Sequence, residues 1–465
     1  MKKILFIVTL LVIFTTIIYQ SFDFDFKKDS THLYVKNSNN FFVKILKKII
    51  PQEIKKIAKD TIFVFKKVSL LEDKVKEKDI FIRELLNDQK SFIFSIDKNK
   101  INKTKLGDVK VRLKKYTSNS FAEIRSRSYL DLYKKNLFLV SGEGVLSYAS
   151  FEDITDEKLN FSVVNSNLSQ IINGENSVKN LLVKNNKIYV SYVKELNNEC
   201  FTNAILVGKI NFGKIIFKEF LVLDGCEENL DHQSGGNLAD FKDNKILMSI
   251  GDYSNYERIN RVQKLDNHIG KIISIDENTK KYKILSIGHR NSQGLYYDKQ
   301  ENIIYSTDHG PQGGDEINLN TSPDDEIKNY GWPISSYGEH YGFPDTDNSE
   351  LYALAPLKKS HSKYGFIEPL FYFDPSIGIT QIIKTDKFIR IPNKKIIYVT
   401  SLGYDIKEGD LSIHQFIIQN DSTVEKHNIL PVNERIRDII YIQELDKMFM
   451  TLDSSGSIGV LEIDD

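Results

Sequence analysis

The chain has 465 residues, of which 41% are hydrophobic and 27% are charged. This composition is typical of globular proteins and excludes both wholesale disorder and a collagen-like repeat. The 63 basic and 63 acidic residues balance, so the net charge gives no argument for a nucleic-acid-binding protein. Only two cysteines are present, which excludes a disulfide scaffold and a cysteine-rich metal site.

The chain begins with an apolar segment that we expect to enter a membrane. Two lysines precede an apolar run from Ile4 to about Tyr19, which is the pattern of an export signal. No small-x-small cleavage site follows, so residues 1–22 are predicted to be an uncleaved signal anchor, with a cleaved signal peptide as the alternative. The rest would lie on the periplasmic or extracellular side of the inner membrane, where Cys200 and Cys226 can pair.

Residues 23–114 are predicted to be a basic, mainly helical stalk. Apolar residues occupy heptad positions between Val68 and Leu85. This stretch is too short to decide between a coiled coil and an amphipathic helix that packs on the main body or on the membrane surface.

Six short β-rich runs repeat along residues 115–465. Most follow an Asn- or Asp-bearing turn, which is a hairpin signature. The runs recur about every 50–60 residues, apart from one longer interval, and such repeats are typical of propeller blades. They are residues 136–141, 187–191, 245–249, 302–306, 395–400 and 447–451. We therefore predict an all-β fold, a six-bladed β-propeller, with a β-sandwich as the alternative.

The residues that follow these runs occupy equivalent positions, so we expect them to gather at one end of the ring. Glycine is frequent there, which lets the backbone approach a ligand closely. His232 and Asp252 flank the third hairpin and can meet at this end. A carboxylate raises the basicity of a neighbouring imidazole and fixes its orientation, so His232 is a candidate general base, with a purely structural histidine as the alternative.

Two further segments supply groups for an oxygen-rich ligand. Gly288–Leu295 places Arg290 and Asn291 on a tight loop, and the planar fork of an arginine suits such a ligand. Asp308–Asn318 combines bare backbone with carboxylates, whose oxygens are calcium ligands rather than zinc ligands. A histidine-based zinc site is the rival interpretation, but the histidines match no His-x-x-x-His spacing.

Five motifs in this part of the chain resemble those of one enzyme family. In order they read His-Gln-Ser-Gly, Ile-Gly-Asp, Gly-His-Arg-Asn-x-Gln-Gly-Leu, His-Gly-Pro-x-Gly-Gly-Asp-Glu-Ile-Asn and Asn-Tyr-Gly-Trp-Pro. The chain resembles the glucose/sorbosone dehydrogenase family of quinoprotein sugar dehydrogenases, which are six-bladed propellers that bind pyrroloquinoline quinone (PQQ) and calcium. The resemblance is most specific over residues 231–333, weaker over 115–465 and absent from 1–110.

The resemblance implies a redox site. His232 would be the general base that removes a proton from a sugar hydroxyl, and Asp252 would orient it. Arg290 and Asn291 would contact the quinone oxygens. The implied substrate is an aldose or related polyol, and the electrons would pass to an acceptor of unknown identity.

The resemblance also implies two metal sites. The backbone carbonyls of Gly310 and Pro311 would bind the calcium that accompanies the cofactor and polarises it as a Lewis acid. A second, structural calcium is found in some members of the family. Glu316 and Tyr330 would be its ligands.

Further cofactor contacts come from the last hairpin and from the residue before Gly310. Arg435 and Arg437 match an Arg-x-Arg motif that contacts the cofactor, whose three carboxylates require cations. His309 stands before the Gly-Pro pair, as in the aldose-type branch of the family.

Two positions depart from the family pattern. Glu143 takes the place of a cofactor-binding glutamine. Gly403 takes the place of a lysine that binds a cofactor carboxylate, with Lys407 as a nearby substitute. These departures favour the alternative function, a non-catalytic propeller ectodomain that binds a protein or a glycan. A hydrolase has no serine nucleophile motif to support it.

Overall fold

The computed structural model describes residues 90–97, 101–124, 127–172, 177–197, 200–228, 233–419 and 423–464. Leu85–Asp465 form one compact unit, called the body below. The predicted anchor over residues 1–22 and most of the predicted stalk lie outside the described residues. Within the described ranges, no helix is both long and apolar enough to cross a membrane.

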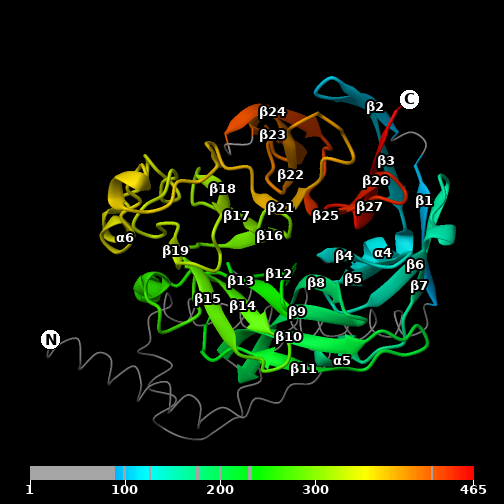
Figure 1. Ribbon diagram of the computed structural model, residues 1–465, viewed down its shortest axis with the longest axis horizontal. Coiled ribbons are helices and arrows are strands. Elements are labelled where there is room, and N and C mark those ends of the chain that lie inside the picture. Colours follow the sequence, from blue (N-terminus) through cyan, green and yellow to red (C-terminus); the bar gives the residue numbers. More distant parts are fainter. Residues whose placement is uncertain are drawn as a thin grey trace, which may run out of the picture. The chain divides into compact units, whose positions relative to one another are not determined.

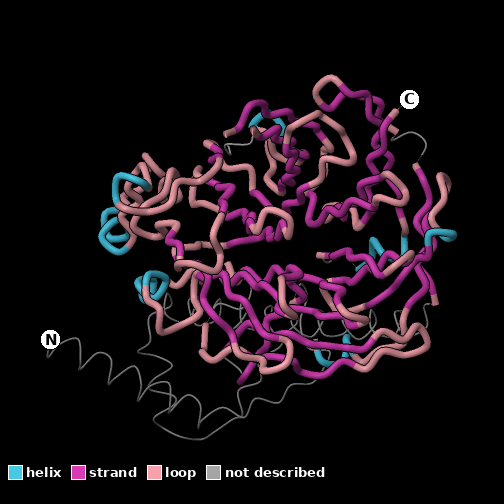
Figure 2. The backbone as a smooth tube through the Cα atoms, in the orientation of Figure 1, coloured by secondary structure: helices cyan, strands magenta, loops and turns pink. Residues whose placement is uncertain are grey.

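The body is built mainly of antiparallel β-sheet (Figures 1 and 2). One four-stranded sheet contains β8 Val178–Lys184, β9 Lys187–Asn197, β10 Cys200–Lys209 and β11 Phe217–Val222. The next contains β12 Gly235–Phe241, β13 Lys245–Ile250, β14 Lys271–Asp276, β15 Tyr282–Ile287 and the short β19 Lys328–Asn329. A third sheet contains β16 Ser292–Asp298, β17 Ile303–Asp308, β18 Asp315–Asn320 and β20 Phe371–Phe373. A fourth contains β21 Ile379–Lys384, β22 Lys395–Ser401, β23 Ser412–Ile418 and β24 Val424–Pro431.

A ten-stranded sheet joins the two ends of the body. Its strands are β1 Ser91–Ile96, β2 Asn102–Leu106, β3 Val109–Thr117, β4 Ser128–Tyr133, β5 Asn136–Ser141, β6 Leu146–Ser150, β7 Lys158–Val163, β25 Ile436–Ile442, β26 Lys447–Leu452 and β27 Ser457–Ile463. Strand β27 pairs antiparallel with β3, so the last strand is held by one of the first.

Short helices lie in the connections between strands. They are α4 Asn119–Ile124, α5 Leu168–Ile171 and α6 Ser349–Leu354, with 3-10 turns η2 Phe151–Asp153, η3 Tyr256–Gln263, η4 Ser362–Tyr364 and η5 Ile406–Glu408. The longest interval between the predicted runs, residues 307–394, contains long loops, α6 and η4 in addition to β18, β19, β20 and β21 (Figure 1).

All six runs predicted from the sequence are strands, namely β5, β9, β13, β17, β22 and β26. Their hairpin turns use the residue types that were expected. Asn185 and Asn186, between β8 and β9, have φ values of 51° and 59°, and Asp243 and Asn244 have φ values of 54° and 55°. Positive φ at both residues is the conformation that a tight hairpin requires, and Asn and Asp tolerate it.

The helical prediction is wrong for residues 91–114, where the structure has strands β1, β2 and most of β3. Phe92 and Phe94 are buried while Ile93 between them is 51% exposed. Val111 and Leu113 alternate in the same way on β3. This period of two is that of a half-buried strand, and the many lysines of the segment obscured it. The predicted boundary at residue 115 falls inside β3.

One strand of each repeated unit lines the centre of the body. These inner strands are β4, β8, β12, β16, β21 and β25; each contacts the next, and β25 contacts β4. Because they start at one end and run in the same direction, the residues before them gather at one end of the ring. The residues after them gather at the other end.

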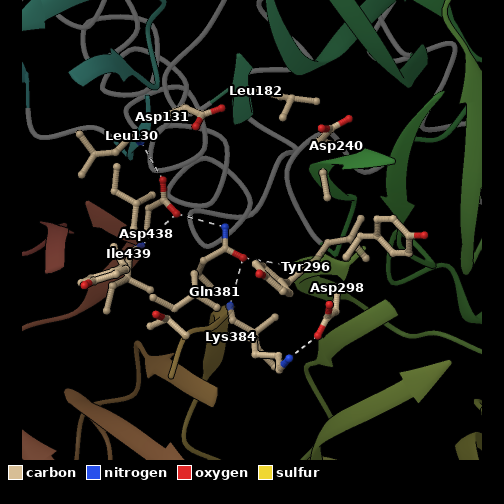
Figure 3. A pocket seen from close by; sticks show the side chains of 18 of the residues that line it. Leu130, Asp131, Leu182, Asp240, Tyr296, Asp298, Gln381, Lys384, Asp438 and Ile439 are labelled. Atoms are coloured by element: carbon tan, nitrogen blue, oxygen red, sulfur yellow. Dashed lines mark hydrogen bonds and ion pairs between the residues drawn. The ribbon is translucent and has the colours of Figure 1, made fainter. Parts of the chain in front are cut away.

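Polar side chains tie neighbouring inner strands together (Figure 3). Asp438 on β25 accepts a hydrogen bond of 2.7 Å from the N–H of Leu130 on β4, and one of 3.1 Å from the amide of Gln381 on β21. Asp131 on β4 accepts from the N–H of Val183 on β8. The inner strands belong mostly to different sheets and share no backbone ladder, so these side chains satisfy their free N–H groups.

A cavity of about 600 Å³ lies at the end of the ring toward which the inner strands run. Asp131, Asp240 and Asp438 line it, together with Tyr296 and Lys384 (Figure 3). Lys384 forms an ion pair with Asp298. We call this the axial cavity; it contains none of the site residues predicted from the sequence.

Cys200 and Cys226 form a disulfide, with their Cα atoms 4.9 Å apart. Phe201 and Glu227, the residues that follow the two cysteines, exchange backbone hydrogen bonds of 2.9 Å. The carboxylate of Glu227 also receives two hydrogen bonds from Arg261, at 2.7 and 2.8 Å. These contacts hold Cys226 and Glu227, which precede His232 in the chain, against β10.

Candidate active site

The predicted site residues that the structure describes lie at the end where the inner strands begin, called the arginine end below. Arg290 donates to the carbonyls of His309 and Gly310, at 3.1 and 2.7 Å. Burial lowers the pKa of His309 to about 3, and the charges of Arg290, Arg437 and Arg435 add to this effect. Three separate loops of the ring therefore meet here.

Asp252 is buried, with 1% of its surface exposed. It accepts hydrogen bonds from the N–H of Ser254 at 2.8 Å and from the indole N–H of Trp332 at 2.9 Å. Burial raises the pKa of Asp252 to about 6, although the nearby charge of Arg290 acts in the opposite direction. This carboxylate is thus held in a dry environment by neutral donors.

His232 lies outside the described residues, so its predicted role stays a prediction. Its neighbour Gln233 is described and has a φ of 53°. With its amide oriented to satisfy its surroundings, Gln233 donates to Asp252 at 2.8 Å and accepts from Arg290 Nη2 at 2.8 Å and from Ser254 Oγ at 2.7 Å. The residue after His232 is therefore anchored to both predicted partners of the site.

Arg290 is the centre of this arrangement. Its guanidinium lies over the ring of Trp332, 5.3 Å from the centroid, and 5.9 Å from the ring centroid of Tyr341. Its Nε atom is buried and has no hydrogen-bond partner among the described residues. A buried, unsatisfied donor is costly, so this arginine is suited to an oxygen-rich ligand at the arginine end.

Asp308 holds the loop that carries Arg290 and Asn291. Its Oδ1 atom accepts the backbone N–H groups of both residues, at 3.1 and 2.6 Å. Its Oδ2 atom contacts Nδ1 of His289 at 2.9 Å, and the other ring nitrogen of His289 contacts Ser286 at 2.8 Å. This buried chain fixes the backbone from which Arg290 and Asn291 project.

Asn291 joins two of the inner strands. Its side-chain oxygen accepts from the N–H of Gly235 at 3.3 Å and from the amide of Gln293 at 2.8 Å. Gly235 starts β12 and Gln293 lies on β16. In this structure Asn291 therefore serves the ring itself at the edge of the site.

Arg435 and Arg437 line the same end on the opposite side of the ring. Arg437 is buried and donates twice to Asp453 Oδ2, at 2.9 and 2.7 Å. Arg435 donates to the carbonyl of Leu402 at 2.7 Å, and the ring of Tyr404 lies 4.6 Å from its guanidinium carbon. Tyr404 is 84% exposed, so the Arg435–Tyr404 pair is open to a ligand.

Glu143 lies half-buried in the turn after β5, which is also at the arginine end. Gly403 leaves no room for a side chain, because a Cβ atom there would lie 1.9 Å from an oxygen of Asp410. Asp410 is held by the backbone N–H groups of Tyr404 and Asp405. The departure at Gly403 is therefore built into the packing of this loop.

Three of the four predicted metal ligands surround a cavity of about 10 Å³, close to the minimum for one water. They are Gly310, Glu316 and Tyr330; Pro311 does not line this cavity. Glu316 contacts His361 at 3.0 Å and accepts from Asn318 at 3.2 Å. Burial raises its pKa.

These ligands already have protein partners. The carbonyl of Gly310 accepts from Arg290, and that of Pro311 accepts from Ser376 at 3.1 Å. The hydroxyl of Tyr330 donates to a backbone carbonyl at 2.7 Å. No group of three or more His, Cys, Asp or Glu suited to a metal occurs among the residues described. The arrangement does not fit calcium as it stands, and no step below depends on it.

The family model for Glucose / Sorbosone dehydrogenase matches residues 177–459. The chain belongs to the glucose/sorbosone dehydrogenase family. Aldose sugar dehydrogenase YliI of Escherichia coli is 26% identical over 238 residues, which is 48% of this chain and 58% of that protein. An uncharacterised protein of Synechocystis is 29% identical over 220 residues, 42% of this chain and 48% of that protein. The chain spans about half the length of these curated relatives.

Solved structures of sugar dehydrogenases share the fold of this family member. The soluble aldose sugar dehydrogenase of Escherichia coli, in its apo form, gives a TM-score of 0.57 at 18% identity, covering 76% of this chain and 99% of that chain. The holo form of the pyranose dehydrogenase PQQ domain of Coprinopsis cinerea gives 0.50 at 13% identity, with 72% and 91% covered. The family resemblance expected from the motifs is confirmed.

The sequence did not indicate several contacts that organise this dehydrogenase-family site. Gln233 bridges Asp252 and Arg290, Trp332 donates to Asp252, and Asp308 holds the Arg290 loop. Gln233 and Trp332 lie within the quoted motifs and Asp308 immediately precedes one of them, which was the available signal. Their roles depend on distances between loops far apart in sequence, which no local pattern contains.

Proposed function

We propose that the body is a six-bladed propeller that oxidises an aldose or related polyol with PQQ as its cofactor. The observation that carries the proposal is Arg290, whose guanidinium is braced by Gln233, Trp332 and two carbonyls yet keeps a buried Nε without a partner among the described residues. Family membership supports sugar oxidation. A bound quinone would supply the acceptor for a hydride from the sugar.

The residues of the arginine end fit an anionic, planar cofactor. Arg290 would donate to the quinone oxygens, and the exposed face of the Arg435–Tyr404 pair would contact a carboxylate. Asn291 would help to place Arg290 by keeping β12 and β16 together. His309, kept neutral by burial and by the neighbouring arginines, would offer an uncharged ring nitrogen at the rim.

Proton removal would fall to His232. A ring nitrogen of His232 would accept the proton of the sugar hydroxyl while Asp252 stabilises the resulting positive charge. Gln233 supports this arrangement because it links the backbone next to His232 to both Asp252 and Arg290. The base and the quinone-binding arginine would therefore keep a fixed separation.

The cellular location belongs to the proposal, whereas calcium does not fit the ligands as they are placed and is left to experiment. A calcium ion at Gly310 would require Arg290 to release that carbonyl, so calcium dependence is best tested directly with a chelator. The disulfide between Cys200 and Cys226 supports a location on the periplasmic or extracellular side. Membrane attachment through residues 1–22 would be checked by cell fractionation.

The decisive experiment is a titration of the purified protein with PQQ, with and without calcium, followed by absorbance. Saturable binding at micromolar PQQ, together with dye reduction on addition of an aldose, would support the proposal. Absence of binding in both conditions would overturn it. A panel of aldoses and polyols would then identify the substrate. A panel of electron acceptors would identify the acceptor.

A second candidate is a non-catalytic propeller that binds a protein or a glycan. The packing of Gly403 against Asp410, which leaves no cation at that position, favours it. This candidate predicts that a folded His232→Ala variant keeps the biological function. Loss of function in that variant would exclude it.

A further inference from the structure

A buried lysine lies beside the candidate site without being part of it. Lys271 has 0% of its surface exposed and is the first residue of β14. Its neighbours in the sheet are Ile250, the last residue of β13, and Ile287, the last residue of β15. Asp252 follows shortly after β13, and Arg290 follows shortly after β15. Lys271 therefore lies between the two strands that lead into these site residues.

The ammonium group of Lys271 is held by backbone carbonyls. It donates to the carbonyls of Arg261 at 3.2 Å, Val262 at 2.7 Å and Ile269 at 2.6 Å. An ammonium has three N–H donors, so these carbonyls use all of them. Arg261 and Val262 lie in the last turn of η3, where backbone carbonyls lack partners within the helix and favour a cation. Lys271 thus fixes the end of η3.

Gln263, the last residue of η3, extends this contact to the segment around Trp332. Its Nε2 atom donates to the backbone carbonyl of Trp332 at 2.6 Å. Its side-chain amide also forms two hydrogen bonds with that of Asn329, at 2.7 and 3.2 Å. One side chain of η3 therefore holds the Asn-Tyr-Gly-Trp-Pro segment at two points.

Trp332 connects this segment to the site. Its backbone is fixed on both sides, because its N–H donates to the carbonyl of Gly288 at 3.1 Å and its carbonyl is bound by Gln263. Its indole Nε1 atom donates to Asp252 at 2.9 Å, and its ring lies under the guanidinium of Arg290. The position of the indole thus depends on the position of η3.

We propose that Lys271 is a positioning residue: by holding the end of η3, it keeps the indole of Trp332 against Asp252. The effect passes through Gln263. Because Lys271 is fully buried, it acts on the site only through its neighbours. The inference rests on the proposed function, in which Asp252 stabilises the charge of the general base.

The test observes Trp332 directly, because it is the only tryptophan of the chain. Full-length protein labelled with nitrogen-15, without cofactor, should give a single indole N–H signal in a heteronuclear NMR spectrum. The proton shift of this signal reports the hydrogen bond to Asp252. Lys271→Met removes the ammonium group and should move the signal upfield, since the hydrogen bond weakens.

The pH of the measurement is set by the two buried charges. Burial raises the pKa of Asp252 to about 6. Burial lowers the pKa of Lys271 to about 7; the charge of Arg261 adds to this effect and that of Asp266 opposes it. Spectra are therefore recorded at about pH 6.5, where both groups are mainly charged.

Gln263→Met breaks the next contact and leaves Lys271 in place. Gln263 is only half-buried, so this variant should fold, and its signal should also move upfield. The double variant should move the signal no further than the larger single change, because both changes interrupt the same set of contacts.

Lys184→Met is the matched control. Lys184 is also buried and donates to the backbone carbonyls of Phe241 and Lys245, at 3.0 and 2.5 Å, but it lies at the end of β8, toward the axial cavity. Its removal should leave the indole signal where it is. An equal displacement in this variant would overturn the inference, because it would show a general loosening of the fold.

An unchanged signal in folded Lys271→Met or Gln263→Met would also overturn the inference. If Lys271→Met does not fold, Lys271→Gln replaces it; this variant keeps two N–H donors and should give a smaller upfield displacement. In PQQ-loaded protein, Lys271→Met should lower kcat by about tenfold, the factor for one weakened hydrogen bond to a charged group. Failure of the wild type to bind PQQ would overturn the proposed function and leave the NMR result unaffected.

Discussion

The two ends of the inner strands differ in how their charges are satisfied. At the axial cavity, Asp131 and Asp438 accept backbone N–H groups of neighbouring strands, and Lys384 is paired with Asp298. At the arginine end, Arg290 keeps a buried donor without a partner among the described residues, and Arg435 faces an exposed tyrosine.

This difference shows that cavity size is a poor guide to function in this ring. The axial cavity is much the larger, about 600 Å³ against about 10 Å³ beside Gly310. Its polar groups nevertheless complete the fold, because they replace a backbone ladder that the inner strands lack. The arginine end, by contrast, has a hydrogen-bond donor without a partner among the described residues, as expected of a site that binds a ligand.

The largest expected effect comes from removing Arg290. Arg290→Ala should lower dye reduction by about a thousandfold, because a cation that stabilises developing negative charge is lost. The matched change at the other end, Lys384→Gln, should leave the rate unchanged. Steady-state kinetics with PQQ-loaded protein measures both. A comparable loss in Lys384→Gln would remove the functional distinction between the ends.

The pH dependence of stability tests whether Asp252 is desolvated at the arginine end. Because burial raises its pKa from the ordinary value to about 6, the folded protein binds this proton more tightly than the unfolded chain does. The stability that this provides is complete below about pH 4 and is lost as the pH rises through 6.

Asp252→Asn removes this pH dependence. Between pH 4 and 7 the wild type should lose up to about 3 kcal/mol of unfolding free energy relative to the variant. Urea unfolding across this pH range gives the difference. Parallel curves would show that Asp252 is not desolvated as the structure indicates.

Asp131 gives the corresponding measurement at the axial cavity. Burial raises its pKa to about 7, so the same sign applies and stability is lost as the pH rises through 7. Asp131→Asn should reduce that loss by about 2 kcal/mol, allowing for its partial exposure. Dye reduction should not change. A drop in activity would mean that the axial cavity takes part in function.

The smallest effect is expected from Trp332→Phe. This change removes the indole donor to Asp252 while keeping an aromatic ring beside Arg290. It should cost about 1–2 kcal/mol of unfolding free energy, since a buried acceptor loses one partner. The acidic limb of the rate profile should move to higher pH, which a purely structural role of Trp332 would not cause.

The positions of the strands were largely predictable from the sequence, whereas their connections in space were not. The run at residues 187–191 became part of β9 because its turn residues, Asn185 and Asn186, favour a hairpin locally. Strands β1–β3 were missed because the lysines of β2 and β3 obscured the alternation of Val111 and Leu113. Strands β3 and β27 lie far apart in the sequence, so no local sequence pattern could indicate that they pair.

The candidate site shows the same division. The motifs identified Arg290, Asp252 and the Gly310 carbonyl as neighbours, and the structure brings the arginine to that carbonyl. The sequence did not indicate that Arg290 would compete with a metal ion for the Gly310 carbonyl, because that depends on the direction of the Arg290 side chain.

The pairing of β27 with β3 has a consequence for biogenesis. Arg112 on β3 and Glu462 on β27 are 350 positions apart in the chain and yet form an ion pair. The growing chain cannot form this pairing until its last strand, β27, has been synthesised. Maturation should accordingly be a slow, late event, during which the exposed edge of β3 is vulnerable to proteases and dependent on chaperones.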